Sequence, residues 1–150
     1  MSTLFVDTSA LAKRYLSEVG SAWVRSVTAP AAGHVVIIAS VTVVEMFSLL
    51  ARRGREGTLA AANITLLGNA FLLHTEREYL VVPLDGRVLA QARTLVARFP
   101  LRTLDAIQLA SAQTAGAILG ESITFISSDR NLLAAASAEG LLTDDPLMHP

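Results

Sequence analysis

The sequence contains no cysteine, a single lysine, few aromatic residues and few charges. Without cysteine there are no disulfide bonds, no thiolate metal sites and no cysteine nucleophiles, which fits a reducing cytoplasm. Charged residues make up 17% and hydrophobic residues 52% of the chain, and this balance excludes disordered, coiled-coil and collagen-like proteins. The formal net charge of −1 provides no global positive field for nucleic acid, although a local basic patch is compatible with it. An aromatic content of 5% disfavours extensive base stacking.

The sequence also shows no signal-peptide pattern and no membrane-spanning segment. The amino-terminal residues lack the basic stretch and the long apolar stretch of a signal peptide. The most apolar window, residues 35–51, is shorter than the about 20 residues that a membrane-spanning helix needs, and it contains Glu45. We therefore expect a cytoplasmic protein with no membrane segment. A chain of 150 residues without linkers or repeats predicts one domain with one large core.

Short β-like runs alternate along the chain with helical stretches. The expected strands are residues 3–6, 34–39, 79–83, 122–126 and 141–143. The expected helices are residues 10–18, 21–28, 40–53, 58–78, 85–99, 103–117 and 130–139, with Ser40 capping the third. Strands that are separated by helices favour an α/β fold, in which a central parallel sheet of four to five strands is flanked by helices.

Four of the 13 acidic residues lie within apolar sequence or directly after an apolar strand. These residues are Asp7, Glu45, Asp105 and Asp129. The other acidic residues lie among turns, charges or glycines, where a solvated surface position is the ordinary interpretation. A buried carboxylate needs a cation, hydrogen bonds or a shifted pKa, so the four acids in apolar surroundings are the informative ones.

Each of these acids also has a purely structural interpretation. Asp7 and Asp129 stand where a strand is followed by a helix, which is the position of a helix N-cap. Asp105 lies in the first turn of a helix, where a negative charge complements the helix dipole. Glu45 lies on a polar face of its helix, and such a face can point to solvent as well as into a cleft.

Taken together, the four acids predict a metal site. The carboxyl ends of parallel strands lie at one edge of a sheet, and ligands bind there. Two of the acids follow strand ends, and two lie near the starts of helices that begin at the same edge. Four converging carboxylates repel one another unless divalent cations bridge them, and oxygen-only ligands suit Mg²⁺ or Mn²⁺. Such ions polarise phosphates and activate water, so the pattern predicts metal-dependent phosphoryl chemistry.

No other nucleophile or phosphate loop competes with this interpretation. The three histidines are scattered, and neither a nucleophile elbow nor a Gly-Lys-Ser/Thr loop occurs. A phosphoaspartyl domain of the dehalogenase type needs a second aspartate two residues after the first, where this chain has Ser9. A receiver domain needs a lysine at the end of a late strand, whereas the only lysine is Lys13.

The acids also belong to an ordered set of four motifs. These are FVDTSAL at residues 5–11, Glu45 in an apolar helix, LDA at 104–106 and SSDRNL at 127–132. This set resembles the PIN-domain ribonucleases, particularly the VapC-type toxins of bacterial and archaeal toxin–antitoxin pairs. The similarity extends over essentially the whole chain.

The resemblance implies a PIN-like three-layer fold in which residues 1–150 form a single PIN domain. It implies a cytoplasmic endoribonuclease, the toxin of a type II toxin–antitoxin pair, that uses Mg²⁺ or Mn²⁺ to activate water. Carried over by position, the four acids would bind the metal and form the catalytic site. Thr8 and Ser128, each adjacent to one of the acids, would bind the carboxylates or a phosphate oxygen.

The resemblance also implies protein partners. It predicts a cognate antitoxin and a homodimer, and the apolar helices at 41–50 and 60–73 are either walls of the antitoxin groove or plain core. Two alternatives stay open. One is a PIN nuclease of RNA processing that is not a toxin, and the other is a catalytically silent PIN-like domain that binds protein. Loss of one or more acids would mark the silent form, and all four are present.

Contact with RNA requires positive charge near the acids. Basic residues close to the four motifs in sequence are the candidates for these contacts, and a solvated surface position is the alternative for each. The candidates are Lys13, Arg14, Arg52, Arg53, Arg102 and Arg130.

Overall fold

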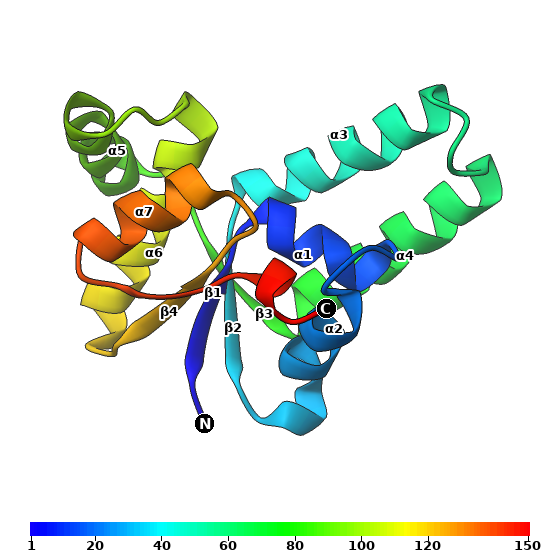
Figure 1. Cartoon of the computed structure of the whole chain (residues 1–150), viewed down its shortest axis with the longest axis horizontal. Coiled ribbons are helices and arrows are strands. Elements are labelled where there is room, and N and C mark those ends of the chain that lie inside the picture. Colours follow the sequence, from blue (N-terminus) through cyan, green and yellow to red (C-terminus); the bar gives the residue numbers. More distant parts are fainter.

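The computed structural model describes all 150 residues and contains a five-stranded parallel sheet between two layers of helices (Figure 1). The strand order is β3-β2-β1-β4-β5, and every neighbouring pair is parallel. The strands are β1 (Thr3–Val6), β2 (Val35–Ala39), β3 (Tyr79–Val82), β4 (Ile123–Ile126) and β5 (Leu142–Asp144). The predicted α/β fold with a parallel sheet is therefore confirmed.

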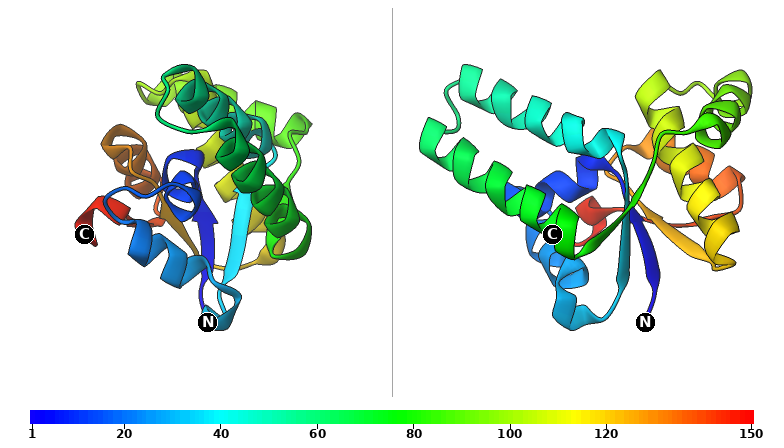
Figure 2. Two further views of the ribbon diagram at one scale, coloured as in Figure 1. Left: turned by 90° about the vertical axis from the view of Figure 1, so that its right-hand side faces the viewer. Right: turned by 180° about the vertical axis from the view of Figure 1, so that it is seen from behind.

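Seven α-helices and two short 3-10 helices connect and cover these strands. They are α1 (Thr8–Tyr15), α2 (Ser21–Thr28), η1 (Pro30–Ala32), α3 (Val41–Arg55), α4 (Ala61–Arg77), α5 (Gly86–Arg98), α6 (Thr103–Leu119), α7 (Arg130–Ala138) and η2 (Pro146–Met148). Helices α5, α6 and α7 cover one face of the sheet, and α1, α2 and α4 lie on the other side (Figures 1 and 2). Helices α3 and α4 extend from the body as an antiparallel pair. None of the helices has both the length and the apolar character that a membrane crossing requires.

The three central strands β2, β1 and β4 are buried on both faces, which explains why they are continuous apolar runs. Within β1, Phe5 faces the core under α5, α6 and α7, whereas Leu4 and Val6 face the core on the side of α1. Phe5 stacks on Phe125 of β4 with ring centroids 5.5 Å apart. Burial on two sides leaves polar side chains at the ends of the strands, where the functional candidates lie.

Two local expectations about α3 were wrong. Ser40 does not cap the helix with its side chain, because its backbone is already helical and its N–H continues the sheet by donating to the carbonyl of Val82. The helix also continues through Gly54 to Arg55, beyond its expected end at residue 53. A side chain at Gly54 would collide with Ile64 of α4, so this glycine allows the two helices to approach closely.

The carboxyl-terminal segment packs against the start of α2. Gly20 precedes that helix with a φ of +88°, and a Cβ atom there would collide with the carbonyl oxygen of Pro146. Trp23 and His149 stack with centroids 4.2 Å apart, and His149 Nε2 lies 2.7 Å from Asp144 Oδ1. Glycine at position 20 therefore allows both the left-handed backbone conformation and the close approach of η2.

We expect Gly20→Ala to lower the free energy of unfolding by about 2–4 kcal/mol, because it combines left-handed strain with a backbone collision. Gly33→Ala is the matched control, since Gly33 has a φ of +71° but no atom within 4 Å of a built Cβ. The control should lose only about 1 kcal/mol. Urea denaturation measures both losses, and equal losses would contradict the proposed packing.

Candidate functional site

All four acids in apolar sequence line one pocket at the carboxyl ends of the strands. The cavity has a volume of about 480 Å³ and lies where β1 and β4 end and where α3 and α6 begin. Its polar lining residues are Asp7, Thr8, Ser9, Glu18, Glu45, Ser48, Arg52, Arg53, Arg102, Asp105, Gln108 and Asp129. The parallel topology thus brings together four carboxylates from elements far apart in the chain.

Asp7 is the most deeply buried of these acids, with only 4% of its surface exposed. It follows β1 and caps α1, since Oδ1 accepts hydrogen bonds from the Ala10 N–H (3.0 Å) and the Ser9 hydroxyl (2.7 Å). The other oxygen, Oδ2, accepts from the Ser127 hydroxyl at 2.6 Å. Asp7 is therefore an N-cap and a pocket residue at once.

Asp105 lies in the first turn of α6, and Asp129 is the N-cap of α7. Asp129 Oδ1 accepts hydrogen bonds from the backbone N–H groups of Asn131 (2.9 Å) and Leu132 (3.2 Å). Asp105 Oδ2 lies 3.5 Å from Nε of Arg102, whose side chain is largely exposed. The helix starts thus hold both carboxylates at the pocket.

The pKa values of two acids in the pocket are raised, mainly because their carboxyl groups are buried. Burial raises the pKa of Asp7 to about 6 from the ordinary 3.8, the hydrogen bonds from Ser127, Ala10 and Ser9 oppose this, and the charge of Asp105 adds to it. Burial also raises the pKa of Asp105, and the charge of Asp129 raises it further. Simultaneous ionisation of these acids is therefore unfavourable, and a cation bound between them would favour it.

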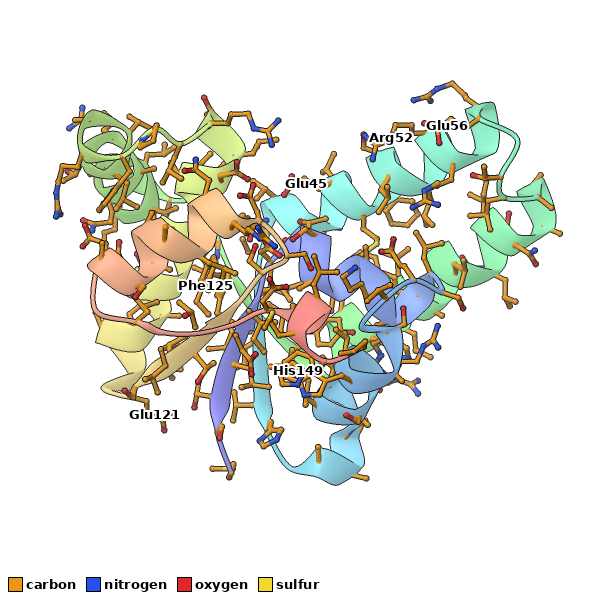
Figure 3. All side chains as sticks on the ribbon, in the orientation of Figure 1. Glu45, Arg52, Glu56, Glu121, Phe125 and His149 are labelled. Carbon is orange, nitrogen blue, oxygen red and sulfur yellow. The ribbon has the colours of Figure 1, made fainter.

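Glu45 projects from α3 and is held by one of its two carboxylate oxygens. Oε1 lies 2.9 Å from the Thr8 hydroxyl and 2.8 Å from Nε2 of Gln108. Figure 3 shows Glu45, Arg52 and Glu56 in succession along α3, from the body of the molecule outward. The Thr8 contact is of the kind expected from the sequence, while Gln108 was not among the predicted residues.

Ser128 does not make the carboxylate contact that was predicted for it. Its hydroxyl is buried without a hydrogen-bond partner, and its N–H donates to the Ser9 hydroxyl at 3.1 Å. The neighbouring Ser127 binds Asp7 instead, because Val6 pairs with Ile126 and the next residues, Asp7 and Ser127, therefore lie side by side.

The basic candidates divide into two groups. Arg52, Arg53 and Arg102 line the pocket, and Arg130 is exposed at the start of α7 beside Asp129. Arg53 also lies 3.6 Å from Glu18.

Lys13 and Arg14 do not line the pocket. Lys13 is 5% exposed, and its Nζ lies 3.7 Å from Glu18. Arg14 donates to Glu78 at 2.9 Å and to the Tyr79 hydroxyl at 2.7 Å. Both cations, at the end of α1, are paired with groups of the protein, so we do not include them among the side chains that reach the pocket.

The sequence reasoning missed Ser9, Ser127, Thr42 and Gln108. Ser9 and Ser127 lie inside the motifs that were recognised, and each touches Asp7. Gln108 lies three residues after Asp105, a spacing that places both on one face of α6. This spacing from Asp105 is the sequence feature from which Gln108 could have been predicted as a pocket residue.

The donor set fits a hard divalent cation, since it consists of carboxylate and hydroxyl oxygens. No three acidic or histidine side chains lie close enough together to form a compact metal-binding cluster.

The pKa of Asp7 predicts an unusual pH dependence of stability in EDTA. Because the folded state raises this pKa, the stabilising contribution is complete below about pH 3.8 and is lost as the pH rises through about 6. At about pH 7.5 we expect Asp7→Asn to raise the free energy of unfolding by about 2 kcal/mol, and at about pH 4 the gain should vanish. Urea denaturation at each pH measures this difference.

The matched control is Asp85→Asn, which alters the N-cap of α5 outside the pocket. Hydrogen bonding to the Val88 N–H lowers the pKa of Asp85, so its contribution is present at neutral pH and lost in acid. Asp85→Asn should therefore lower stability at about pH 7.5. A gain for Asp7→Asn that is the same at both pH values would refute the assignment.

Comparisons with known proteins agree with this fold. Among solved structures, the chain is similar to VapC20 from Mycobacterium tuberculosis, a sarcin-ricin loop cleaving toxin, with 19% identity, a TM-score of 0.64, and 93% of this chain and 96% of that chain covered. It is similar to VapBC2 from Rickettsia felis bound to a promoter DNA fragment, with 9% identity, a TM-score of 0.67, and 95% and 98% covered. It is also similar to FitAcB from Neisseria gonorrhoeae, with 16% identity, a TM-score of 0.64, and 95% and 97% covered.

At these identities the structural similarities establish the fold. A search of curated protein sequences finds no significant match. The sequence model of the PIN domain matches residues 4–138, which is most of the chain. The chain therefore belongs to the PIN domain family, as the four motifs predicted.

Proposed function

We propose that the protein is a cytoplasmic, metal-dependent endoribonuclease and the toxin of a type II toxin–antitoxin pair. The observation that carries this proposal is the meeting of four carboxylates from four different elements in one pocket of a PIN domain. The pocket lining contains no cysteine or histidine that could serve as a nucleophile. The fold similarity to VapC20, a sarcin-ricin loop cleaving toxin, supports RNA as the substrate.

Asp7, Asp105 and Asp129 would hold the Mg²⁺ or Mn²⁺, and Glu45 would complete the site. When bound, such an ion neutralises the crowded carboxylates, polarises a phosphate and makes water a better nucleophile. The protein supplies fixed oxygen positions: Ser9 and Ser127 hold the two oxygens of Asp7 in place.

Asp129 and Glu45 are also held by hydrogen bonds, but each through only one of its carboxylate oxygens. The backbone of α7 holds Oδ1 of Asp129, and both hydrogen bonds to Glu45 end on Oε1. The second oxygen of each side chain is left for a ligand, for water or for the substrate. This division favours a site that is organised before its ligand binds.

Arginine side chains would bind the RNA on either side of the acids. Arg52 and Arg53 line the pocket from α3, and Arg102 lines it from the segment before α6. Arginine contacts with phosphates position a nucleic acid without reading its sequence. The substrate backbone would therefore cross the acids between α3 and α6.

Exposed apolar surfaces support the two protein partners. Val44 and Leu66 are exposed on the α3–α4 pair, and we propose that the antitoxin covers this surface. The similarity to toxin–antitoxin complexes, one of them from Klebsiella pneumoniae, supports such a partner. Leu80 and Val81 are exposed on the edge strand β3, which is where a second copy would form the homodimer.

A nuclease assay tests the proposed function. Purified protein should cleave structured RNA with Mg²⁺ or Mn²⁺ present, and EDTA should abolish the cleavage. Asp7→Asn, Asp105→Asn and Asp129→Asn should each reduce the rate by on the order of 100-fold or more. Asp85→Asn again serves as the control, because Asp85 caps α5 as Asp129 caps α7 but lies outside the pocket. Cleavage that survives EDTA, or that survives in the pocket variants, would refute the mechanism.

The RNA path predicts a second effect that does not depend on catalysis. In an Asp105→Asn background, Arg52→Gln should weaken RNA binding and make the slope of log affinity against log salt shallower by about 1. Arg77→Gln is the control, since Arg77 is exposed at the end of α4 and does not line the pocket. Fluorescence anisotropy over a series of salt concentrations measures both slopes. Equal effects of the two substitutions would exclude the proposed path.

A further inference from the structure

Gln108 is a buried amide in the wall of the pocket. It is 2% exposed and stands between the buried residues Ile107 and Leu109 of α6. Asp105 lies three residues earlier on the same helix, so both side chains share one helical face. Helix α6 therefore provides a carboxylate and an amide to the same cavity.

The amide nitrogen of Gln108 lies among three oxygen atoms from other elements. Nε2 is 2.8 Å from Glu45 Oε1, 2.9 Å from Thr42 Oγ1 and 3.1 Å from Thr8 Oγ1. An ionised carboxylate can only accept hydrogen bonds, so the amide must present its nitrogen, and not its oxygen, to Glu45. The orientation of the amide is therefore fixed by the charge of Glu45.

This orientation leaves the amide oxygen without a partner. Oε1 of Gln108 is buried and makes no hydrogen bond, and a buried acceptor of this kind lowers stability. Rotating the amide would place that oxygen against the Glu45 carboxylate. A methionine or leucine would fill the same space in this apolar helix without burying an unsatisfied atom, so packing alone does not account for the glutamine.

We infer that Gln108 is a positioning residue that fixes Glu45 from across the pocket. With Thr8 it binds Oε1 of Glu45, which leaves Oε2 available to a cation or to water and sets Glu45 of α3 relative to Asp105 of α6. The inference rests on the proposed function for the chemistry that Glu45 serves. The contact itself is a property of the protein without metal.

The test uses Gln108→Met, which removes the amide, and Gln108→Asn, which keeps an amide that is one methylene too short. Gln113→Met is the matched control on the same helix, because Gln113 binds Gln91 and Glu139 away from the pocket. Each Gln108 variant is also made together with Glu45→Ala. The measurements are steady-state RNA cleavage, titration with MnCl₂ followed by electron paramagnetic resonance, and urea denaturation in EDTA.

We expect each Gln108 variant to lower kcat and Mn²⁺ affinity by about 10-fold or more while KM for RNA changes less than about twofold. Gln113→Met should change none of these quantities. In the Glu45→Ala background, the Gln108 variants should change Mn²⁺ affinity less than about twofold, because the group they position is already absent. Equal losses in both backgrounds, or an equal loss in Gln113→Met, would overturn the inference.

Urea denaturation in EDTA tests the contact between Gln108 and Glu45 independently of the proposed nuclease function. If the wild-type protein neither cleaves RNA nor binds Mn²⁺, the nuclease proposal fails, but the contact between Gln108 and Glu45 can still be judged. The inference then stands if the change in the free energy of unfolding caused by the Gln108 variants differs between the wild-type and the Glu45→Ala backgrounds. It falls if that change is the same in both backgrounds.

Discussion

The burial of the Asp7 carboxylate in a pocket that also contains Asp105 is the constraint on which the rest of the site depends. A charge with 4% exposure at the end of β1 is tolerable only where hydrogen bonds surround it, and the Ser9, Ala10 and Ser127 donors do so. Even with these donors its pKa stays near 6, because burial and Asp105 outweigh them. The start of α1 and the side chains of Ser9 and Ser127 thus all donate hydrogen bonds to the Asp7 carboxylate, and the register of β1 against β4 brings Ser127 to it.

Much of the fold could be predicted from the sequence, because burial on both faces of a parallel sheet makes its strands continuous apolar runs. The same property marked Asp7 and Asp129, which end such runs, and Glu45 and Asp105, which interrupt apolar helices. The helix ends were less predictable. The sequence predicts that α3 ends at residue 53, whereas the helix continues through Gly54, next to the Ile64 side chain of α4.

Contacts that depend on how elements are placed in space could not be predicted. Ser127 and Ser128 are equivalent in sequence, and the register of β1 against β4 decides which of them meets Asp7. The same holds for Lys13 and Arg14, whose charges look available until packing places them beside Glu18 and Glu78. Sequence patterns identify groups that are costly to bury, whereas tertiary packing determines their partners.

For Asp129 and Glu45 the structural and the functional interpretations are compatible, because the protein binds only one of the two carboxylate oxygens. Asp129 caps α7 with Oδ1, and Glu45 is tied to α1 and α6 through Oε1, so each keeps one oxygen free of the protein. Asp85 caps α5 in the same way, yet it lies outside the pocket. Capping therefore does not make a carboxylate functional. What distinguishes Asp129 is that β4 lies next to β1 in the sheet, which places its carboxylate in the same pocket as Asp7.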